Sequence, residues 1–373
     1  MARYLEHEPL YVPRDEAGRY DDLLSLGDVE RLVCSGALRV PAFRLVKADA
    51  KLDPGDYTVD LPWRPRPFTG AADVERVASE FASGATIVLQ ALHLNHLPLA
   101  LFCRELEARL GHPVQANAYY TPRAAQGLPV HHDTHDVLVL QVAGRKRWLV
   151  YDPVFELPLK NQRYAPELGE PGATVLDLTL EAGDTLYLPR GWLHEAVTSE
   201  HDSLHLTIGI TTYTAHDAVR AALDSAEDDL ALRRGVADDG ELAEDLLELV
   251  DERLGPEAVA GRMRERFVSS RRPILDGQLE QLRRLDTVTA ETPLEQRPSV
   301  IADLYAVADG FVLAFEGKRI AFPGRLGGEL EFLVTNAGGF AARELPGTLD
   351  ENSRLVLVRR LIREGFLRAT YSG

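Results

Sequence analysis

The residues best able to do chemistry lie between Val130 and Trp148, in the segment VHHDTHDVLVLQVAGRKRW. This segment contains a His-x-Asp pair, His131 and Asp133, at the mouth of an apolar strand, and a later segment, GDTLYLPRGWLH, ends in His194. Alternate residues of an extended strand share a face, so His131 and Asp133 point the same way, about 6.6 Å apart at the backbone. Two imidazoles and one carboxylate can hold one face of an octahedral Fe(II) and leave three positions open. The pattern therefore predicts an iron site of the oxygenase type.

The segment contains two further histidines that compete for the same role. His132 alternates to the face opposite His131, which makes it a poor co-ligand. His135 shares the face, but along a strand it lies roughly 13 Å from His131, too far for both to bind one ion through bonds of about 2 Å. We expect His135 to line the pocket or to end in a hydrogen bond. The alternative to a metal site is a histidine-rich loop that binds no ion.

The order of motifs resembles one enzyme family. Asn-x-Tyr at Asn117 and Tyr119 is followed by the His-x-Asp pair, by Gly-Arg-Lys-Arg-Trp, and by a Gly-Asp-x-Leu-Tyr-Leu-Pro-x-Gly-x-x-His block. This order resembles the JmjC-type cupin hydroxylases, and among them the ribosomal oxygenases. The resemblance is strong from Asn117 to about Thr212 and looser on both sides. It implies a 2-oxoglutarate-dependent dioxygenase that hydroxylates a His or Arg side chain of a ribosomal protein.

The resemblance also implies roles for individual residues. The metal ligands carry over to His131, Asp133 and His194, with Fe(II) as the metal. The basic residue that binds the distal carboxylate of 2-oxoglutarate falls on Lys146, and the supporting co-substrate contacts fall on Asn117 and Tyr119. One position departs from the pattern, because Gly209 stands where the family often has a Ser near the co-substrate.

Binding of a 2-oxo acid co-substrate would require a residue such as Lys146, whatever the family. A 2-oxo acid chelates iron through one end, and the far carboxylate then needs a buried cation. Lys146 offers a compact point charge, with Trp148 on the same strand face to keep the site dry. Arg145 and Arg147 alternate to the other face, where we expect them to be solvated or to face the substrate. The competing interpretation is that Lys146 is an ordinary hairpin lysine.

Composition predicts a cytoplasmic enzyme with more than one domain. The chain has 373 residues, a net charge of −17, and only two cysteines, so no disulfide framework is implied and a reducing compartment is expected. The first residues lack the apolar stretch of a signal peptide, and no apolar run is long enough to cross a membrane.

The predicted fold class is α+β, with three parts along the chain. Residues 1–213 are expected to form a double-stranded β-helix (cupin/JmjC) barrel with an N-terminal extension, because ATVLDL, DTLYLP and LHLTIGIT are β-branched runs broken by Gly and Pro. Upstream, helices are expected in SLGDVERLVCSGAL, with Ser25 near its start, and in LPLALFCRELEARLG, whereas the Pro-rich DLPWRPRPF is expected to be a loop.

The remaining two parts are a helical module at 214–297 and a winged-helix-like domain at 298–373. The last part is predicted to contain a helix that ends at Ala308, a hairpin at Glu316-Gly317, and a helix capped by Ser353 with a strand after it. Arginines cluster on that terminal helix, which would suit DNA recognition, but an apolar stripe on the same helix favours packing with a solvated basic side. Direct nucleic-acid binding is also disfavoured by the acidic balance of the chain.

The acidic segment from Asp224 to Glu257 permits two interpretations. It carries thirteen acidic residues and three arginines, with apolar residues at helical spacing. One interpretation is a pair of helices with solvated acidic outer faces. The other, implied by the resemblance, is a homodimerisation module built on Leu242, Leu246, Leu249 and Leu254. In either case an acidic chain suits a basic protein partner, such as a ribosomal protein.

The sequence leaves the substrate open. The same core could serve an oxygenase that acts on a small molecule or a peptide natural product. A cupin that binds metal but only scaffolds other proteins is a further alternative. No residue between Asn117 and His194 decides between these functions.

Overall fold

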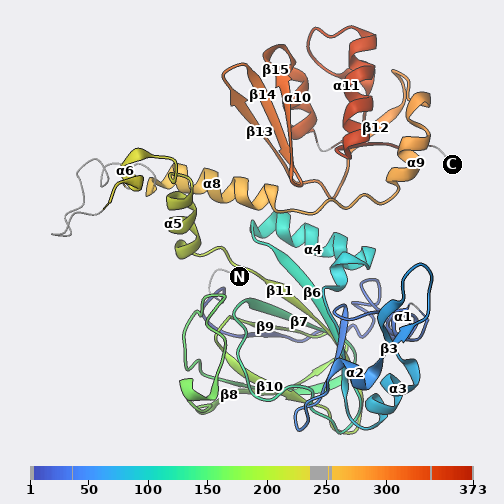
Figure 1. The fold of residues 1–373 in the computed structure, drawn as a ribbon, viewed down its shortest axis with the longest axis vertical. Helices are drawn as coiled ribbons and strands as arrows, with labels where there is room; N and C mark the ends of the chain where they lie inside the picture. The colour runs from blue at the N-terminus through green and yellow to red at the C-terminus, as the bar shows by residue number, and fades with distance from the viewer. Residues whose placement is uncertain (1–3, 36, 236–250, 252–253, 337, 372–373) are drawn as a thin grey trace. The chain divides into compact units, whose positions relative to one another are not determined.

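The computed structural model describes residues 4–35, 37–235, 251, 254–336 and 338–371 of the 373-residue chain. These residues form two compact units, 1–212 and 213–373 (Figure 1). Each unit has its own apolar core. The boundary predicted at 297/298 stays a prediction.

The first unit is built mainly from antiparallel strands. Its strands are β1 (Leu10–Val12), β2 (Phe43–Val46), β3 (Thr58–Leu61), β4 (Phe68–Ala72), β5 (Thr86–Leu89), β6 (Val114–Thr121), β7 (Asp136–Tyr151), β8 (Thr174–Glu181), β9 (Thr185–Leu188), β10 (Leu193–Val197) and β11 (Ser203–Ile210). Its helices are α1 (Leu26–Cys34), α2 (Pro54–Tyr57), α3 (Val74–Ala82) and α4 (Leu97–Leu110), with short 3-10 turns at Leu92–Leu94 and Pro166–Leu168.

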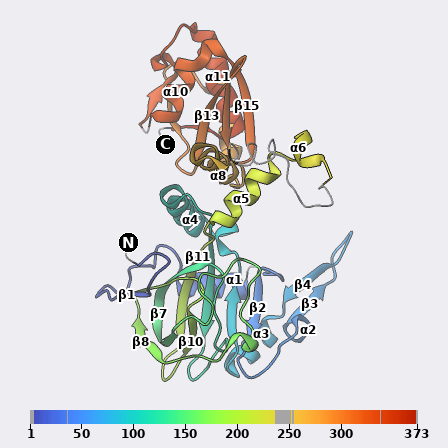
Figure 2. The ribbon, with the colours of Figure 1, turned by 90° about the vertical axis from the view of Figure 1, so that its left-hand side faces the viewer.

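Strand β7 joins the two sheets of this unit. Its first half pairs with β9 and β11 in a sheet of order β1-β9-β7-β11-β6-β5-β2, and its second half pairs with β8 and β10. Gly144 lies between the halves at φ +67, where a Cβ would meet the carbonyl oxygen of Asp202 at 1.9 Å, so only glycine fits. The sheets lie face to face in Figure 2, and side chains from both line one cavity.

The helices of the first unit begin where the sequence indicates. Ser25 accepts a hydrogen bond from the Asp28 backbone N–H, and the Asp28 carboxylate accepts one from the Ser25 backbone N–H, which forms a capping box at the start of α1. Helix α4 ends at Gly111, whose φ of +69 suits a C-terminal cap. Both helices confirm the prediction, and α4 contributes Leu99 and Cys103 to the core.

The second unit combines helices with two small sheets. Its helices are α5 (Ala215–Asp224), α6 (Leu230–Arg233), α8 (Pro256–Ser269), α9 (Gln278–Arg283), α10 (Gly327–Thr335) and α11 (Glu351–Glu364). Its strands are β12 (Pro293–Gln296), β13 (Ala302–Val307), β14 (Gly310–Phe315), β15 (Lys318–Pro323), β16 (Phe340–Ala341) and β17 (Leu367–Ala369), with 3-10 turns at Leu285–Thr287, Gly324–Leu326 and Ala342–Glu344. The sheets have the orders β13-β14-β15 and β16-β12-β17.

Two local predictions in this unit were wrong. The segment expected to be a helix through Ala308 is strand β13, because all six of its residues pair with β14, and sheet pairing overrides the helical spacing. Helix α11 is capped by Asp350 and not by Ser353, since the Asp350 carboxylate accepts the backbone N–H of Ser353. The predicted hairpin turn at Glu316-Gly317 is confirmed, with positive φ at both residues.

The arginines of α11 make contacts within their own unit. Arg354 donates to the carbonyl of Arg343 at 2.7 Å, and Arg359 donates to the carbonyl of Val288 at 2.7 Å. The opposite stripe, with Val358 and Leu361, is fully buried. This arrangement favours the packing interpretation of the helix, and the winged-helix assignment stays a prediction.

The predicted dimerisation stripe falls largely outside the residues that the structure describes. Leu242, Leu246 and Leu249 lie outside the described residues, and only Leu254 of the predicted stripe lies within them. The homodimer therefore stays a prediction.

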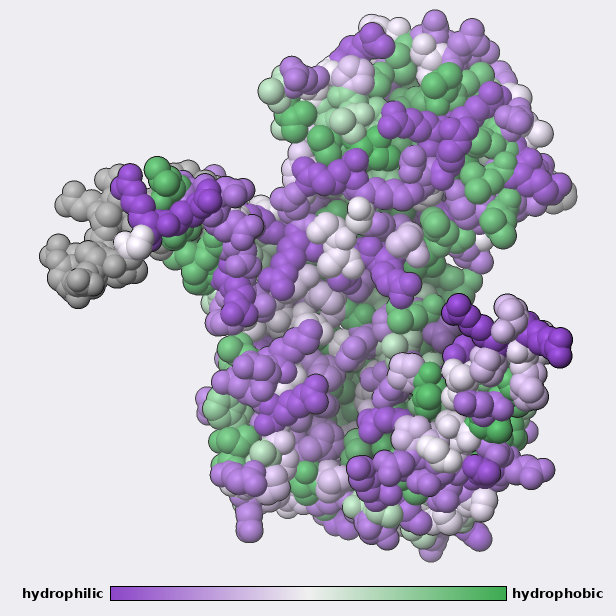
Figure 3. Space-filling view, in the orientation of Figure 1, coloured by the Kyte–Doolittle hydropathy of each residue, from purple (hydrophilic) through white to green (hydrophobic). Residues whose placement is uncertain are grey.

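The surface of the described chain is mainly hydrophilic on the face drawn in Figure 3, with apolar side chains in scattered groups. Among the described residues no helix has both the length and the apolar character needed to cross a membrane.

Candidate metal centre and adjoining cavity

The His-x-Asp pair lies immediately upstream of β7, in an extended segment that is tied to the start of β10. His131 and His194 form an isolated antiparallel bridge, with the His131 N–H donating to the His194 carbonyl at 3.1 Å and the reverse bond at 2.8 Å. The Gly191 N–H donates to the Asp133 carbonyl at 3.0 Å. These backbone bonds join segments about sixty residues apart in the sequence and bring all three side chains together.

The segment GDTLYLPRGWLH is two strands and not one, because a turn at Pro189–Trp192 separates β9 from β10. Gly191 has a φ of +91, and a Cβ there would lie 2.6 Å from the carbonyl oxygen of Phe155. The Asp136 carboxylate accepts the Arg190 backbone N–H at 2.9 Å and holds this turn against the start of β7. This turn changes the direction of the chain between β9 and β10, so that His194 faces His131.

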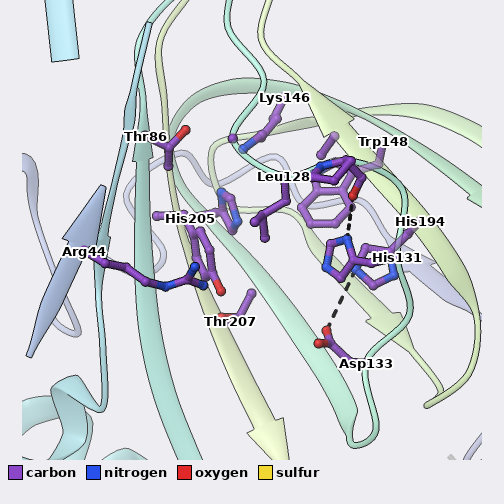
Figure 4. A pocket seen from close by; sticks show the side chains of 14 residues that line it. Arg44, Thr86, Leu128, His131, Asp133, Lys146, Trp148, His194, His205 and Thr207 are labelled. Atoms are coloured by element: carbon purple, nitrogen blue, oxygen red, sulfur yellow. Dashed lines mark hydrogen bonds and ion pairs between the residues drawn. The ribbon is translucent and has the colours of Figure 1, made fainter. Parts of the chain in front are cut away.

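Potential ligand atoms of His131, Asp133 and His194 all lie within 4.8 Å of one another. Nε2 of His194 is 3.8 Å from an Asp133 carboxylate oxygen, and the two imidazole centroids are 4.5 Å apart (Figure 4). This spacing suits three ligands of one ion. The structure therefore brings together the three residues predicted from the sequence.

Both imidazoles are oriented by backbone carbonyls. Nδ1 of His131 lies 2.8 Å from the carbonyl of Pro129, and Nδ1 of His194 lies 3.0 Å from that of Trp192. Because a carbonyl only accepts, each Nδ1 carries the proton and each Nε2 keeps a free lone pair, as is usual for histidines that bind a metal. Burial lowers the pKa of His194 to about 4, so it is neutral, as a ligand must be, at pH 7.

The two other histidines of the segment lie elsewhere. Nε2 of His132 is 3.1 Å from the carbonyl of Gln162, and its ring packs against Tyr164. The His135 imidazole occupies the space beside Gly209, where a Cβ would meet its ring atoms at 2.5 and 2.6 Å. Neither residue lines the cavity, which excludes the first of the two alternatives given for His135.

A cavity of about 370 Å³ adjoins the three residues and is large enough for a small organic ligand. Side chains from both sheets line it, as Figure 4 shows. Its lining residues are Arg44, Thr86, Tyr119, Gly127, Leu128, Pro129, His131, Asp133, Lys146, Trp148, His194, Ala196, His205 and Thr207.

Lys146 is a cation buried in this cavity, with 5% of its surface exposed. Its ammonium donates to the Thr121 hydroxyl at 2.9 Å, and among the described residues no carboxylate forms an ion pair with it. Burial lowers the pKa of Lys146 to about 7. Arg145 and Arg147 point to the opposite face, as predicted, where they form exposed ion pairs with Glu181 and Asp177.

Two residues of β6 were predicted to contact the co-substrate, and the structure places only one of them in the cavity. Tyr119 lines the cavity, and burial together with Asp133 raises the pKa of its phenol, which therefore remains a hydrogen-bond donor. Asn117 does not line the cavity, and its side-chain amide oxygen Oδ1 accepts the Ala91 backbone N–H at 2.9 Å. The structure does not bring Asn117 to the site predicted for it.

Several lining residues were not predicted from the sequence. Arg44 extends from β2 into the cavity, and His205 and Thr207 come from alternate positions of β11 (Figure 4). The alternation of His205 and Thr207 in an apolar strand was a usable signal. No such signal pointed to Arg44, because the sequence of β2, FRLV, does not indicate that this strand pairs with β5 at the edge of the sheet.

Three lining side chains retain unused polar atoms. Within the described residues, Nε1 of Trp148, Nδ1 of His205 and Oγ1 of Thr207 are buried and have no hydrogen-bond partner. Burial and the nearby Lys146 ammonium hold the pKa of His205 well below its usual range, so the ring is neutral. A buried polar atom without a partner is costly, and a polar ligand in the cavity can supply these partners.

Comparisons with known proteins agree with this architecture. Residues 92–218 match the family model of the JmjC domain. The chain is 32% identical over 251 residues to ribosomal oxygenase 2 of Rattus norvegicus, covering 62% of this chain and 50% of that protein. It is 29% identical over 249 residues to the bifunctional lysine-specific demethylase and histidyl-hydroxylase NO66 of Drosophila persimilis, covering 63% of this chain and 34% of that protein. The chain thus spans half or less of these relatives.

Among solved structures, the Escherichia coli ribosomal oxygenase YcfD in complex with cobalt and 2-oxoglutarate has a similar fold. The TM-score is 0.58 at 18% identity, over 99% of this chain and 97% of that one. These findings confirm the predicted JmjC cupin fold with mixed helix and sheet content.

Proposed function

We propose that this chain, whose residues 92–218 match the JmjC domain, is an Fe(II)- and 2-oxoglutarate-dependent dioxygenase that hydroxylates a protein side chain. The observation that supports it best is the convergence of His131, Asp133 and His194 beside a cavity with a buried lysine. The similarity to ribosomal oxygenase 2, and to a structure that holds cobalt and 2-oxoglutarate, also supports it.

The metal fits the donor set of this site. His131 and His194 would offer Nε2 and Asp133 a carboxylate oxygen, and two imidazoles with one carboxylate suit Fe(II) with open positions. Bound iron would supply the redox chemistry by which O2 and 2-oxoglutarate become succinate, CO2 and one oxygen atom inserted into a substrate C–H bond.

The protein's own residues would bind and orient the co-substrate. Lys146 would pair with its distal carboxylate, and this pairing would explain why the lysine is buried with no acidic partner among the residues that the structure describes. The Tyr119 phenol would donate to the same ligand from β6, which is separated from β7 by β11. The rings of Trp148 and His205, 5.5 Å apart, would keep bulk water from the space between the cation and the metal.

Arg44 adds a second cation to the cavity, and we assign it a supporting contact to the co-substrate. It is less buried than Lys146 and lies on β2, across the cavity from β7. A guanidinium keeps its charge at any accessible pH, whereas Lys146 titrates near neutrality. Asn117 would affect co-substrate binding only indirectly, because its side-chain amide accepts the Ala91 N–H and does not reach the cavity.

We propose a His or Arg side chain of a ribosomal protein as the substrate. The net charge of −17 favours a basic partner by long-range attraction. The two unpaired cysteines, exposed Cys34 and buried Cys103, support the proposed cytoplasmic location because they suit a reducing compartment.

The test is turnover of 2-oxoglutarate by purified protein with Fe(II), measured as succinate formed in the presence of a ribosomal protein fraction. The wild type should form succinate, and Asp133→Ala should not, because two imidazoles alone hold the ion poorly. His132→Ala is the matched control, since His132 carries no ligand role and its loss should leave turnover intact. Full turnover by Asp133→Ala would refute the metal assignment, and binding of Fe(II) without any succinate would favour a non-catalytic scaffold.

A further inference from the structure

The hairpin β3–β4 stands apart from the main sheets of the first unit. Its strands form a two-stranded sheet with Thr58 opposite Ala72 and Leu61 opposite Phe68, and an isolated bridge between Ala71 and Arg39 ties the base of β4 to the rest of the unit. The hairpin projects from the unit in Figure 2. Every residue of its tip, from Leu61 to Pro67, is exposed.

The tip combines an exposed aromatic ring with positive charge. Trp63 is 73% exposed, the largest exposure among the large exposed hydrophobic residues of the first unit. Arg64 and Arg66 follow it, and within the described chain neither has an ion pair. No acidic residue occurs from Leu61 to Phe68, although the whole chain carries a net charge of −17. An exposed indole ring beside two guanidinium groups, with no acidic residue nearby, can offer both a stacking surface and positive charge to one ligand.

The base of the hairpin is held in place. The Arg39 guanidinium lies 4.2 Å from the Phe68 ring centroid and donates to the Thr69 carbonyl at 2.9 Å. The Asp60 carboxylate accepts the Gly70 N–H at 2.9 Å. The tip itself contains three prolines in six residues, at Pro62, Pro65 and Pro67, which limit its conformations and reduce the entropy lost on binding.

We propose that this tip, residues 61–67, contacts unpaired RNA, with Trp63 stacked on a base and Arg64 and Arg66 on the phosphates. Stacking on an aromatic ring combined with backbone charge is how proteins bind single strands without reading sequence. A basic protein would be repelled by the two arginines. The choice of RNA over DNA rests on the proposed function, because a ribosomal protein substrate lies beside ribosomal RNA.

The acidity of the chain as a whole is consistent with this assignment. Phosphates are repelled by most of the surface, so a strand can approach only where positive charge projects away from it. The expected binding is therefore local, weak and dependent on salt. The arginines of α11 are not part of this surface, since Arg354 and Arg359 donate to carbonyls of their own unit.

The test is fluorescence anisotropy with a labelled oligouridine of about 12 nucleotides, a length within the usual range of single-strand sites. It uses the full chain without Fe(II) or 2-oxoglutarate, so its outcome is independent of catalysis. Trp63→Ala should weaken binding by roughly 5- to 150-fold, the loss typical of one stacked base, and Trp63→Phe should retain most of it. Succinate formation by Trp63→Ala without RNA should equal that of the wild type.

The charge contribution is tested by salt dependence. Removing both arginines in Arg64→Gln/Arg66→Gln should make the slope of log affinity against log salt shallower by about 1.4, at about 0.7 per neutralised phosphate. The matched control is Arg14→Gln/Arg123→Gln, which removes two exposed arginines of the same unit and should leave the slope unchanged.

Three results would overturn the proposal. The first is unchanged oligouridine affinity in Trp63→Ala, and the second is an equal loss in the Arg14→Gln/Arg123→Gln control. The third is tighter binding of oligothymidine or of a polyglutamate peptide at the same tip, which would assign the surface to DNA or to an acidic protein.

Discussion

Lys146 offers the sharpest prediction, because its charge state and its proposed ligand are coupled. Burial lowers the pKa of Lys146 from 10.5 to about 7 in the ligand-free protein. Only the ammonium can pair with the distal carboxylate of 2-oxoglutarate. Affinity should therefore be nearly constant below pH 7 and fall about tenfold per pH unit above it, as the free protein loses the proton that binding requires.

The assay is titration calorimetry of the Fe(II)-loaded protein with 2-oxoglutarate, in the absence of O2, from pH 6.5 to 9 in steps of roughly half a unit. Lys146→Arg is the matched variant, since a guanidinium stays charged and should remove the pH dependence while keeping affinity. Pyruvate is the matched ligand, because it has the same 2-oxo acid end and no distal carboxylate. An equal pH dependence for pyruvate, or for Lys146→Arg, would refute the role of Lys146.

The same burial predicts an effect on stability. The pKa of folded Lys146 lies below its unfolded value, so the unfolded chain binds this proton more tightly and burial destabilises the fold at low pH. At 1.36 kcal/mol per unit, a fall from 10.5 to about 7 corresponds to about 5 kcal/mol. This destabilisation is fully present below about pH 7, and it is lost as the pH rises towards 10.5.

Lys146→Met should therefore raise the free energy of unfolding of the ligand-free protein at pH 7 by several kcal/mol, reduced by about 1 kcal/mol for the lost bond to Thr121. The gain should shrink at pH 9. Urea unfolding at both pH values measures it. If the Lys146→Met protein is less stable than the wild type at pH 7, burial of the lysine does not destabilise the fold as proposed.

Three further predictions concern other parts of the chain. Gly209→Ser should destabilise the first unit by about 1–3 kcal/mol in thermal unfolding, because the new side chain meets the His135 ring, whereas Gly172→Ser, with open space around it, should be neutral. Arg44→Leu should raise the KM for 2-oxoglutarate roughly tenfold, the typical loss of a charged hydrogen bond, and an unchanged KM would remove Arg44 from the co-substrate site. Sedimentation at micromolar concentration should give the mass of two chains, and Leu246→Asp should reduce it to one; a wild-type monomer contradicts the predicted homodimer.

The placement of His131 beside Asp133 could be predicted from the sequence because its signal is local. His131 and Asp133 are two residues apart, and backbone alternation alone places them on one face. The same alternation separated Lys146 from its arginine neighbours correctly. The cap at Ser25 and the hairpin at Glu316-Gly317 were found for the same reason, whereas the cap expected at Ser353 is supplied by Asp350.

Features set by contacts between distant segments could not be predicted in this way. Arg44 enters the cavity because β2 pairs with β5 at the sheet edge, and β13 is a strand because β14 pairs with it. Asn117 shares a strand with Tyr119, but its amide is used by the turn at Ala91. Such pairings depend on tertiary packing, which overrides local propensity.

The central claim is that the chain hydroxylates a ribosomal protein, and mass spectrometry of ribosomal proteins tests it most directly. We expect one His or Arg residue of one ribosomal protein to carry the added mass of a single oxygen atom in cells that have this gene. Deletion of the gene should remove the addition, the wild-type gene should restore it, and Asp133→Ala should not. Ribosomal proteins with identical masses in all four strains would contradict the claim.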